Sequence, residues 1–403
     1  MDVRNTYFLE LLKAALEGRQ TPPERALTAE DWQALVAQAQ RHKVLPLICQ
    51  TAQASAVPEV KAEVRRQVAG QMLKTGQFLA LNRHLRQAGL TPLVVKGIVC
   101  RELYPEPDLR LSADEDLLLP EDQFAAGCAA LEQFGMFTTE KDPDAYERPY
   151  RMEGGPLYIE LHRSMFPPES DAYGHWNRFF VGAFRRAVEM EVGGEKVLTL
   201  CHTDHLLYLI LHAFKHFLHS GFGIRQVCDM VMYANAFGSG IDWEQLLEHC
   251  RQVRAERFTA AVFRIGQKHL GFDPEKAGYP ASWQALQGDE KPLLEDLLSA
   301  GVYGGATESR KHSSNVTLEA VAGSKRGKRG SSALRSALFP PLKTLRGRYP
   351  YLKKYPWLLP VAWADRALRY GTRKDKGGDN SAAEAIRIGN QRLELLRHYG
   401  VID

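Results

Sequence analysis

Leucines recur at helical spacing through the first part of the chain, and helix-boundary residues separate them into segments. Thr28 with Asp31 matches a capping box, in which a hydroxyl and a carboxylate three positions later satisfy the first backbone donors of a helix. Pro58 suits the first turn of a long amphipathic helix that ends near Gly89. The pattern predicts a helical N-terminal region over residues 1–88.

Short strand-like runs follow this helical region. Leu93–Val95 is a continuous apolar run, typical of a buried strand. In residues 157–162 apolar and polar positions alternate strictly, which places Glu160 and His162 on the same side of a second strand. Residues 153–156 contain two glycines and a proline and predict a hairpin turn before that strand.

The remaining segments differ in composition. A helix is expected from Pro120, which suits a helix start, to Phe134. We expect five regions: the helical arm 1–88, a mixed core 89–200, a helical domain 201–300, a basic Gly/Ser-rich linker or loop 301–335, and a basic helical region 336–403. The predicted fold class is α+β, with a small mixed sheet flanked by helices.

Composition agrees with a folded intracellular protein. The chain has 403 residues, of which 44% are apolar and 25% charged, with a net charge of +4. This length suits two or three domains, or one catalytic domain with helical additions. The six cysteines show no paired metal-ligand spacing, and the N-terminus lacks signal-peptide features. We expect free thiols, a cytoplasmic location and no stable membrane insertion.

Acidic residues fall where they can share a face of the sheet. Asp114 and Asp116 are alternate residues of one predicted strand, so their side chains project together while Glu115 points to the other side. Glu160 is the third carboxylate, on a neighbouring strand. Carboxylate oxygens suit Mg²⁺ or Mn²⁺, ions that neutralise a triphosphate during transfer.

These motifs together resemble the polymerase-beta-like nucleotidyltransferase superfamily, and in particular a bacterial family of uncharacterised nucleotidyltransferases. The residues that carry the resemblance are Lys96-Gly97, Arg110, Asp114 with Asp116, and Glu160-Leu161-His162. It continues more weakly through residues 206–229, with His212, Arg225 and Asp229, and through residues 348–360.

The resemblance implies transfer of a nucleoside monophosphate from an NTP to an acceptor hydroxyl. Asp114, Asp116 and Glu160 are then the catalytic residues and the ligands of Mg²⁺ or Mn²⁺. The nucleotide and its phosphates are contacted by Lys96, Gly97, Arg110, His162, Lys215 and Arg225. The choice of NTP stays open, and the acceptor is a small molecule, a protein or an RNA.

Two departures from the family pattern support a second hypothesis, a catalytically degenerate nucleotide-binding or partner-binding module. Better-known nucleotidyltransferases have Gly-Ser at the first turn, where this chain has Lys96-Gly97. Glu115 stands where an apolar residue would pack under the sheet, and a charge there needs a partner or an exposed position.

Individual residues also have structural interpretations. His162 is a phosphate contact, a metal neighbour or a packed core histidine, and Arg110 clamps a phosphate or pairs with Glu106 or Asp108. A third hypothesis is a His/Asp metallohydrolase centred on His212, His216 and Asp229, although Lys215 would repel its cation.

The region after the linker is basic, and tyrosines and Trp357 lie among its lysines and arginines. Such a region binds RNA, acidic lipid headgroups or a phosphorylated substrate, or it is a solvated helix face.

Overall fold

The computed structural model describes residues 2–19, 28–51, 58–140, 142, 144–219, 221–300, 317–318, 320–321, 342–345, 349, 351–372 and 382–403. Most of the expected basic linker at 301–335, including its lysine- and arginine-rich run, lies outside these residues. Side chains of the basic C-terminal region are also described only in part, so the hypotheses about that region stay predictions.

The N-terminal region is helical, as predicted. Its helices are α1 (Val3–Leu16), α2 (Ala29–Arg41), α3 (Leu45–Thr51) and α4 (Pro58–Gln87). The N-cap half of the predicted capping box is present, because the Thr28 hydroxyl accepts a hydrogen bond from the Asp31 N–H at 3.1 Å. The Asp31 carboxylate accepts from that hydroxyl at 2.7 Å. Pro58 begins the long helix α4, where its missing N–H leaves no hydrogen bond unmade.

In the described residues, seven strands form one mixed sheet in the order β3-β4-β5-β2-β1-β7-β6. Their bounds are β1 (Leu93–Val95), β2 (Glu115–Leu118), β3 (Met136–Phe137), β4 (Glu147–Met152), β5 (Tyr158–His162), β6 (Val188–Val192) and β7 (Glu195–Thr199). The β1–β7 and β2–β5 pairs are parallel and the other pairs are antiparallel. The expected β4–β5 hairpin is confirmed.

Strand register brings the acidic residues together. Asp116 on β2 is the direct partner of Glu160 on β5, and Leu118 is the partner of His162. Because alternate residues of a strand share a face, Asp116, Glu160 and His162 lie on one face of the sheet. The side chains predicted to meet are therefore adjacent across two central strands.

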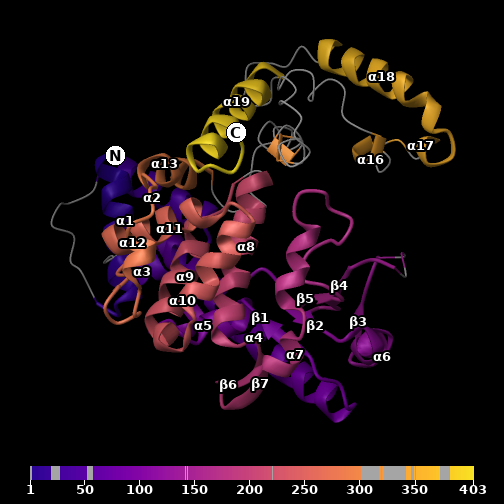
Figure 1. Cartoon of the computed structure of the whole chain (residues 1–403). Coiled ribbons are helices and arrows are strands. Elements are labelled where there is room, and N and C mark those ends of the chain that lie inside the picture. The colour runs from indigo at the N-terminus through magenta and orange to yellow at the C-terminus, as the bar shows by residue number, and fades with distance from the viewer. Residues whose placement is uncertain are drawn as a thin grey trace.

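Helices surround this sheet, so the predicted α+β fold class is confirmed (Figure 1). After α4, the α-helices and 3-10 helices up to residue 300 are α5 (Gly97–Arg101), η2 (Pro107–Leu109), α6 (Glu121–Gln133), η3 (Gly174–Phe180), α7 (Ala183–Arg186), α8 (His202–His219), α9 (Ile224–Phe237), η4 (Gly238–Gly240), α10 (Trp243–Gln252), α11 (Glu256–His269), α12 (Ala281–Gln284) and α13 (Lys291–Ala300). Figure 1 shows α8 between the helices α9 to α11 on one side and the strands β4 and β5 on the other.

The C-terminal elements form two groups. The first group has a small apolar cluster of its own and consists of α16 (Leu342–Leu345), α17 (Tyr351–Lys354), η6 (Pro356–Leu358) and α18 (Leu359–Thr372). The last helix, α19 (Ala382–His398), instead packs on the main core through Leu393 and Leu396. None of the helices in the described ranges combines the length and the apolar character needed to cross a bilayer.

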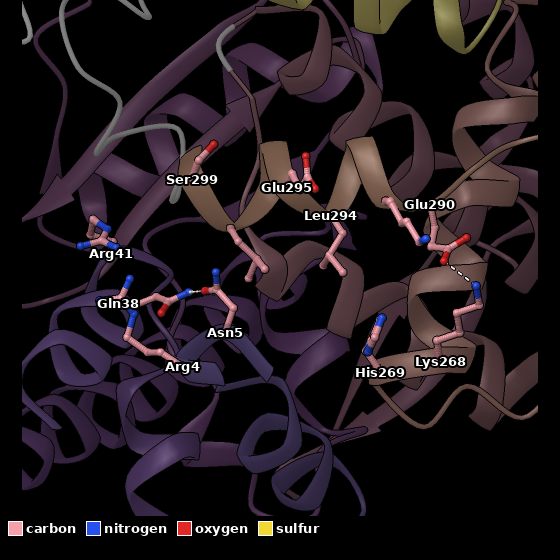
Figure 2. Close-up of a pocket in the computed structure, with 12 residues that line it drawn as sticks. Arg4, Asn5, Gln38, Arg41, Lys268, His269, Glu290, Leu294, Glu295 and Ser299 are labelled. Carbon is pink, nitrogen blue, oxygen red and sulfur yellow. Dashed lines mark hydrogen bonds and ion pairs between the residues drawn. The ribbon is translucent and has the colours of Figure 1, made fainter. Parts of the chain in front are cut away.

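A cavity of about 580 Å³ lies among α1, α2, α11 and α13 (Figure 2). Leu294 and Leu298 contribute apolar surface, whereas Lys268 and Glu290 form an ion pair at 2.5 Å on its wall. This cavity shares no lining residue with the one beside the paired aspartates, which is described next.

Candidate active site

Three potential metal ligands converge on the face of β2 and β5. Ligand atoms of Asp116, Glu160 and His162 lie within 4.8 Å of one another. His162 Nε2 donates to Asp116 Oδ1 at 2.9 Å and lies 3.8 Å from Glu160 Oε2. Asp116 and His162 are buried, whereas 22% of the Glu160 side chain is exposed. The cluster can hold a cation that solvent or substrate reaches from the Glu160 side.

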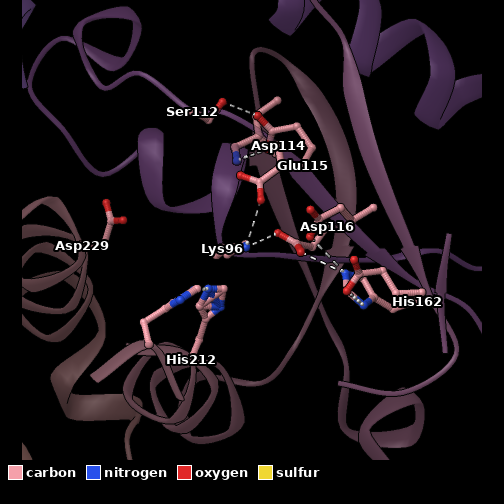
Figure 3. A network of polar contacts seen from close by, with 12 residues as sticks. Lys96, Ser112, Asp114, Glu115, Asp116, His162, His212 and Asp229 are labelled. Atoms are coloured by element: carbon pink, nitrogen blue, oxygen red, sulfur yellow. Dashed lines mark hydrogen bonds and ion pairs between the residues drawn. The ribbon is translucent and has the colours of Figure 1, made fainter. Parts of the chain in front are cut away.

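Lys96 lies between the two aspartates that the sequence pairs (Figure 3). Its Nζ is 2.8 Å from Asp116 Oδ2 and 3.5 Å from Asp114 Oδ2. Asp114 immediately precedes β2, and its carboxylate contacts the same ammonium as Asp116. Of the three carboxylates expected to bind a metal, Asp116 and Glu160 belong to the three-ligand group together with His162, and Asp114 lies outside it.

The turn that carries Lys96 is held by Glu115, on the other face of β2. Glu115 accepts hydrogen bonds from the Ile98 N–H at 2.7 Å and from the Ser112 hydroxyl at 2.6 Å, and Lys74 is its ion-pair partner at 3.7 Å. A Cβ at Gly97 would overlap the Glu115 carboxylate. The charge that departs from the family pattern is thus fully partnered and fixes the shape of the turn.

Burial and neighbouring charges act in opposite directions on the clustered carboxylates. Burial favours a raised pKa for Asp116, but Lys96 and the hydrogen bond from His162 bring its pKa below the ordinary value. Burial and the Asp116 charge raise the pKa of Glu160 instead. Burial opposes the charge of Lys96, yet Asp114 and Asp116 raise its pKa well above the usual range. Lys96 and the aspartates therefore form a charged, mutually stabilised group.

A cavity of about 240 Å³ adjoins this group. Its walls are rich in cationic and imidazole side chains, namely Lys43, Lys96, Arg110, Arg225, His212 and His216, with Asp114 and Asp229 as the acids and Gly97 at the turn. Of the expected phosphate contacts, Lys96, Gly97, Arg110 and Arg225 line it, whereas His162 and Lys215 do not.

Arg110 is anchored by Asp229 of α9. Its Nε and Nη2 donate to the two carboxylate oxygens at 3.0 and 2.6 Å, and the Tyr104 hydroxyl donates to the same carboxylate at 2.8 Å. The suggestion of Glu106 or Asp108 as the partner was wrong, because the true partner comes from a helix far along the chain. Arg110 Nη1 is buried and has no hydrogen-bond partner in the described structure.

The other expected phosphate contacts have different surroundings. Arg225 donates from Nη1 to the Leu111 carbonyl oxygen and so fixes the segment before Asp114. Lys215 is half-buried, with its ammonium 6.0 Å from the centre of the Phe166 ring, and burial followed by the charge of Lys96 lowers its pKa. Lys215 does not line the cavity.

The histidines of α8 do not form the metal site of the hydrolase hypothesis. His212 and His216 share a hydrogen bond between their Nε2 atoms at 2.8 Å, and Asp229 is held by Arg110. Across the described ranges, the three-ligand group is Asp116, Glu160 and His162. Burial, followed by the charges of nearby lysines, lowers the pKa of both histidines, so the pair is neutral at pH 7.

Sequence reasoning missed Lys43 as a member of the cavity wall. Lys43 lies in the turn between α2 and α3, where its backbone φ is +54°. Periodicity gives no signal for such a position, because the residue is polar and lies between helices. The N-terminal arm therefore contributes directly to the cavity.

Comparison with known proteins shows which family the chain belongs to. No curated protein matches the chain. Among solved structures, it is similar to an antigenic nucleotidyltransferase-like protein from Paracoccidioides brasiliensis, at 15% identity over 48% of this chain and 92% of that one, with a TM-score of 0.31. The family described as uncharacterised nucleotidyltransferase matches residues 28–271, more than half of the 403 residues. The chain therefore belongs to this family of uncharacterised nucleotidyltransferases.

Proposed function

We propose that the chain is a metal-dependent nucleotidyltransferase of the polymerase-beta-like type, which transfers a nucleoside monophosphate from an NTP to an acceptor hydroxyl. The observation that carries the proposal is the position of the Asp116, Glu160 and His162 cluster beside a cavity lined with cations. Ligands for a divalent ion and a receptor for phosphates are thus adjacent, as transfer from a triphosphate requires.

The cluster residues fit a divalent cation. Two carboxylates and one imidazole supply oxygen and nitrogen donors. The imidazole atom that faces both carboxylates is Nε2, and its proton would move to Nδ1, which lies 3.8 Å from Glu147 Oε2, when an ion binds. Carboxylates suit Mg²⁺ and Mn²⁺ alike, whereas an imidazole ligand favours Mn²⁺. Bound there, the ion supplies neutralisation of the charge that develops on the transferring phosphate.

The cavity residues fit the remaining phosphates. Asp229 is neutralised by Arg110 and Lys96 is paired with Asp114, so Lys43 and Arg225 leave the wall positive. Arg110 Nη1 is a buried donor with no partner in the described residues, and a phosphate oxygen in the cavity satisfies it. Gly97 lines the same cavity at the turn, next to Lys96.

The side chain of Glu160 is partly exposed, so an acceptor substrate can reach it. It is the most exposed of the three cluster residues, and it either completes the ion's ligands or accepts the proton of the acceptor hydroxyl. The acceptor belongs to a small molecule, a protein or an RNA. In this proposal residues 89–200 are the catalytic core, and residues 1–88 and 201–300 close the cavity through Lys43 and α8.

Calorimetric titration of each NTP, with Mn²⁺, with Mg²⁺ and without either, tests the proposal. We expect ion-dependent binding in the wild type and its loss in Asp116→Asn, because the amide removes the charge that both Lys96 and the ion need. Asp122→Asn, on the exposed side of α6, is the matched control and keeps binding. Equal binding in wild type and Asp116→Asn contradicts the metal role.

A nucleotide-binding module without catalysis is the second candidate. The ion pairs from Lys96 to both aspartates favour it, because these carboxylates already have a cationic partner without a metal. This candidate predicts that NTP binding is the same with and without a divalent ion, and that labelled NTP is never consumed. The titration therefore separates the two candidates.

A further inference from the structure

We propose that the Lys96 ammonium permanently takes the second cation position of the site, so that the protein binds one divalent ion, held by Asp116, Glu160 and His162. The inference rests on the proposed function, since it assumes that the cluster binds a metal. Two-metal sites hold two divalent ions, and here the Lys96 ammonium would take the place of the second ion.

Asp116 faces two cation positions with its two oxygens. Oδ2 lies 2.8 Å from Lys96 Nζ, and Oδ1 accepts the hydrogen bond from His162 at 2.9 Å. A carboxylate that divides its oxygens in this way has the role of the bridging ligand in a two-metal site. The cation position next to Oδ1 is surrounded by Asp116, Glu160 and His162. The cation position next to Oδ2 is occupied by the Lys96 ammonium.

Asp114 is the second carboxylate that contacts the Lys96 ammonium, and it lies outside the metal cluster. Its Oδ2 is 3.5 Å from the same ammonium, and it does not belong to the three-ligand group. Two carboxylates around one ammonium leave that position electrostatically satisfied. A divalent ion there would meet a fixed positive charge within ion-pair distance, and like charges so close repel strongly in a buried site.

The backbone holds Lys96 in place. Its φ is +45°, a conformation that side-chain-bearing residues rarely adopt. Its N–H donates to His205 Nε2 at 3.0 Å, and the next turn is closed by the hydrogen bond from the Ile98 N–H to Glu115. Only 14% of the Lys96 side chain is exposed. A lysine with a strained backbone, a largely covered side chain and an anchored N–H is a built-in part of the site.

The number of Mn²⁺ ions bound per chain, measured by equilibrium dialysis with the metal alone, tests the inference. We expect one ion for the wild type and two for Lys96→Met, which keeps most of the side-chain volume but removes the charge. Lys43→Met is the matched control. It removes a positive charge from the same cavity without touching the paired aspartates, and we expect it to keep one ion.

Asp114→Asn keeps the test decisive if Lys96→Met fails to fold. Because Asp114 contacts the ammonium and not the metal, we expect Asp114→Asn to keep one Mn²⁺, whereas His162→Ala loses it. Two ions in the wild type, or one ion in folded Lys96→Met, overturns the inference and leaves the proposed function standing. The absence of Mn²⁺ from the wild type overturns both, through the metal role itself.

Discussion

At the scale of single residues, the turn before α5 depends on a glycine that touches a buried carboxylate. Gly97 has φ of +35°, and a Cβ there would overlap the Glu115 carboxylate. Glu115 cannot easily move, because it accepts hydrogen bonds from Ile98 and Ser112 and pairs with Lys74. The small residue and the buried acid therefore require each other.

We predict that Gly97→Ala lowers the free energy of unfolding by about 3 kcal/mol, the sum of backbone strain and a displaced buried carboxylate. Urea denaturation measures the change. Gly135→Ala is the control, because Gly135 also has a positive φ but open space around it, so only the backbone cost of about 1 kcal/mol applies. Equal losses in the two variants contradict the proposed overlap with Glu115.

Part of this site could be predicted from single residues and their spacing. The two-residue period of a strand places Glu160 and His162 on one face of β5. Asp114 lies just before β2, so it meets Asp116 through their shared contact with Lys96 and not through strand periodicity. The ammonium between the aspartates and the Arg110–Asp229 pair could not be predicted. Their partners are brought together by turns and by helix packing, and a local pattern contains no information about either.

At the scale of elements, the Arg110–Asp229 ion pair joins α9 to the segment that leads into β2. Both side chains are almost fully buried, and the arginine donates to both carboxylate oxygens. Buried, doubly hydrogen-bonded pairs of this kind are costly to break, because the remaining charge loses its partner without regaining water.

We predict that Asp229→Ala lowers the free energy of unfolding by about 4 kcal/mol, because it leaves Arg110 buried and unpaired. Thermal or urea unfolding of the purified variant measures this loss. Asp403→Ala removes an exposed partner of Arg254 and should leave stability unchanged within error. A loss for Asp229→Ala no larger than for Asp403→Ala shows that the buried pair contributes nothing.

Helices were easier to predict than strands. The starts of α4 and α6 follow from Pro58 and Pro120, because proline lacks the N–H that a first turn does not need. The β6–β7 hairpin was not anticipated, although Gly193 and Gly194 have positive φ at its turn. These strands extend the sheet beside β1, and their charged residues on the outer face weaken the apolar pattern.

At the scale of the whole molecule, one hydrophobic core contains residues from α1 through α13 and α19. His42 lies within this core at the end of α2. Its Nε2 donates to the Leu298 carbonyl oxygen of α13 at 3.4 Å, and its Nδ1 accepts from the Ile224 N–H of α9 at 3.5 Å. A neutral imidazole therefore links three distant helices, and a proton on Nδ1 would break one of the two bonds.

We predict that stability falls as the pH is lowered from 7.5 to 5. Burial lowers the pKa of His42 to about 4, below the value of about 6.5 in the unfolded chain. In that range the unfolded chain binds more protons than the folded one, so His42 alone costs about 2 kcal/mol by pH 5. Urea unfolding across the range measures the loss.

His42→Gln provides the comparison for this effect, because glutamine is neutral throughout. We expect the variant to be less stable at pH 7.5 and to lose less stability on acidification than the wild type. His205, whose pKa burial lowers to about 3, keeps part of the pH dependence in both proteins. Parallel curves for the two proteins exclude His42 as a source of acid sensitivity.

The contact between Gly97 and Glu115 also limits how this family can diverge. A relative that carries any larger residue at the position of Gly97 must have lost the acid at the position of Glu115, together with a reason to keep Lys74 charged. The three positions should therefore change as one group among homologues. Relatives with a serine at the position of Gly97 are expected to have an apolar residue at the position of Glu115. We expect no relative that combines a serine at the first position with the acid at the second.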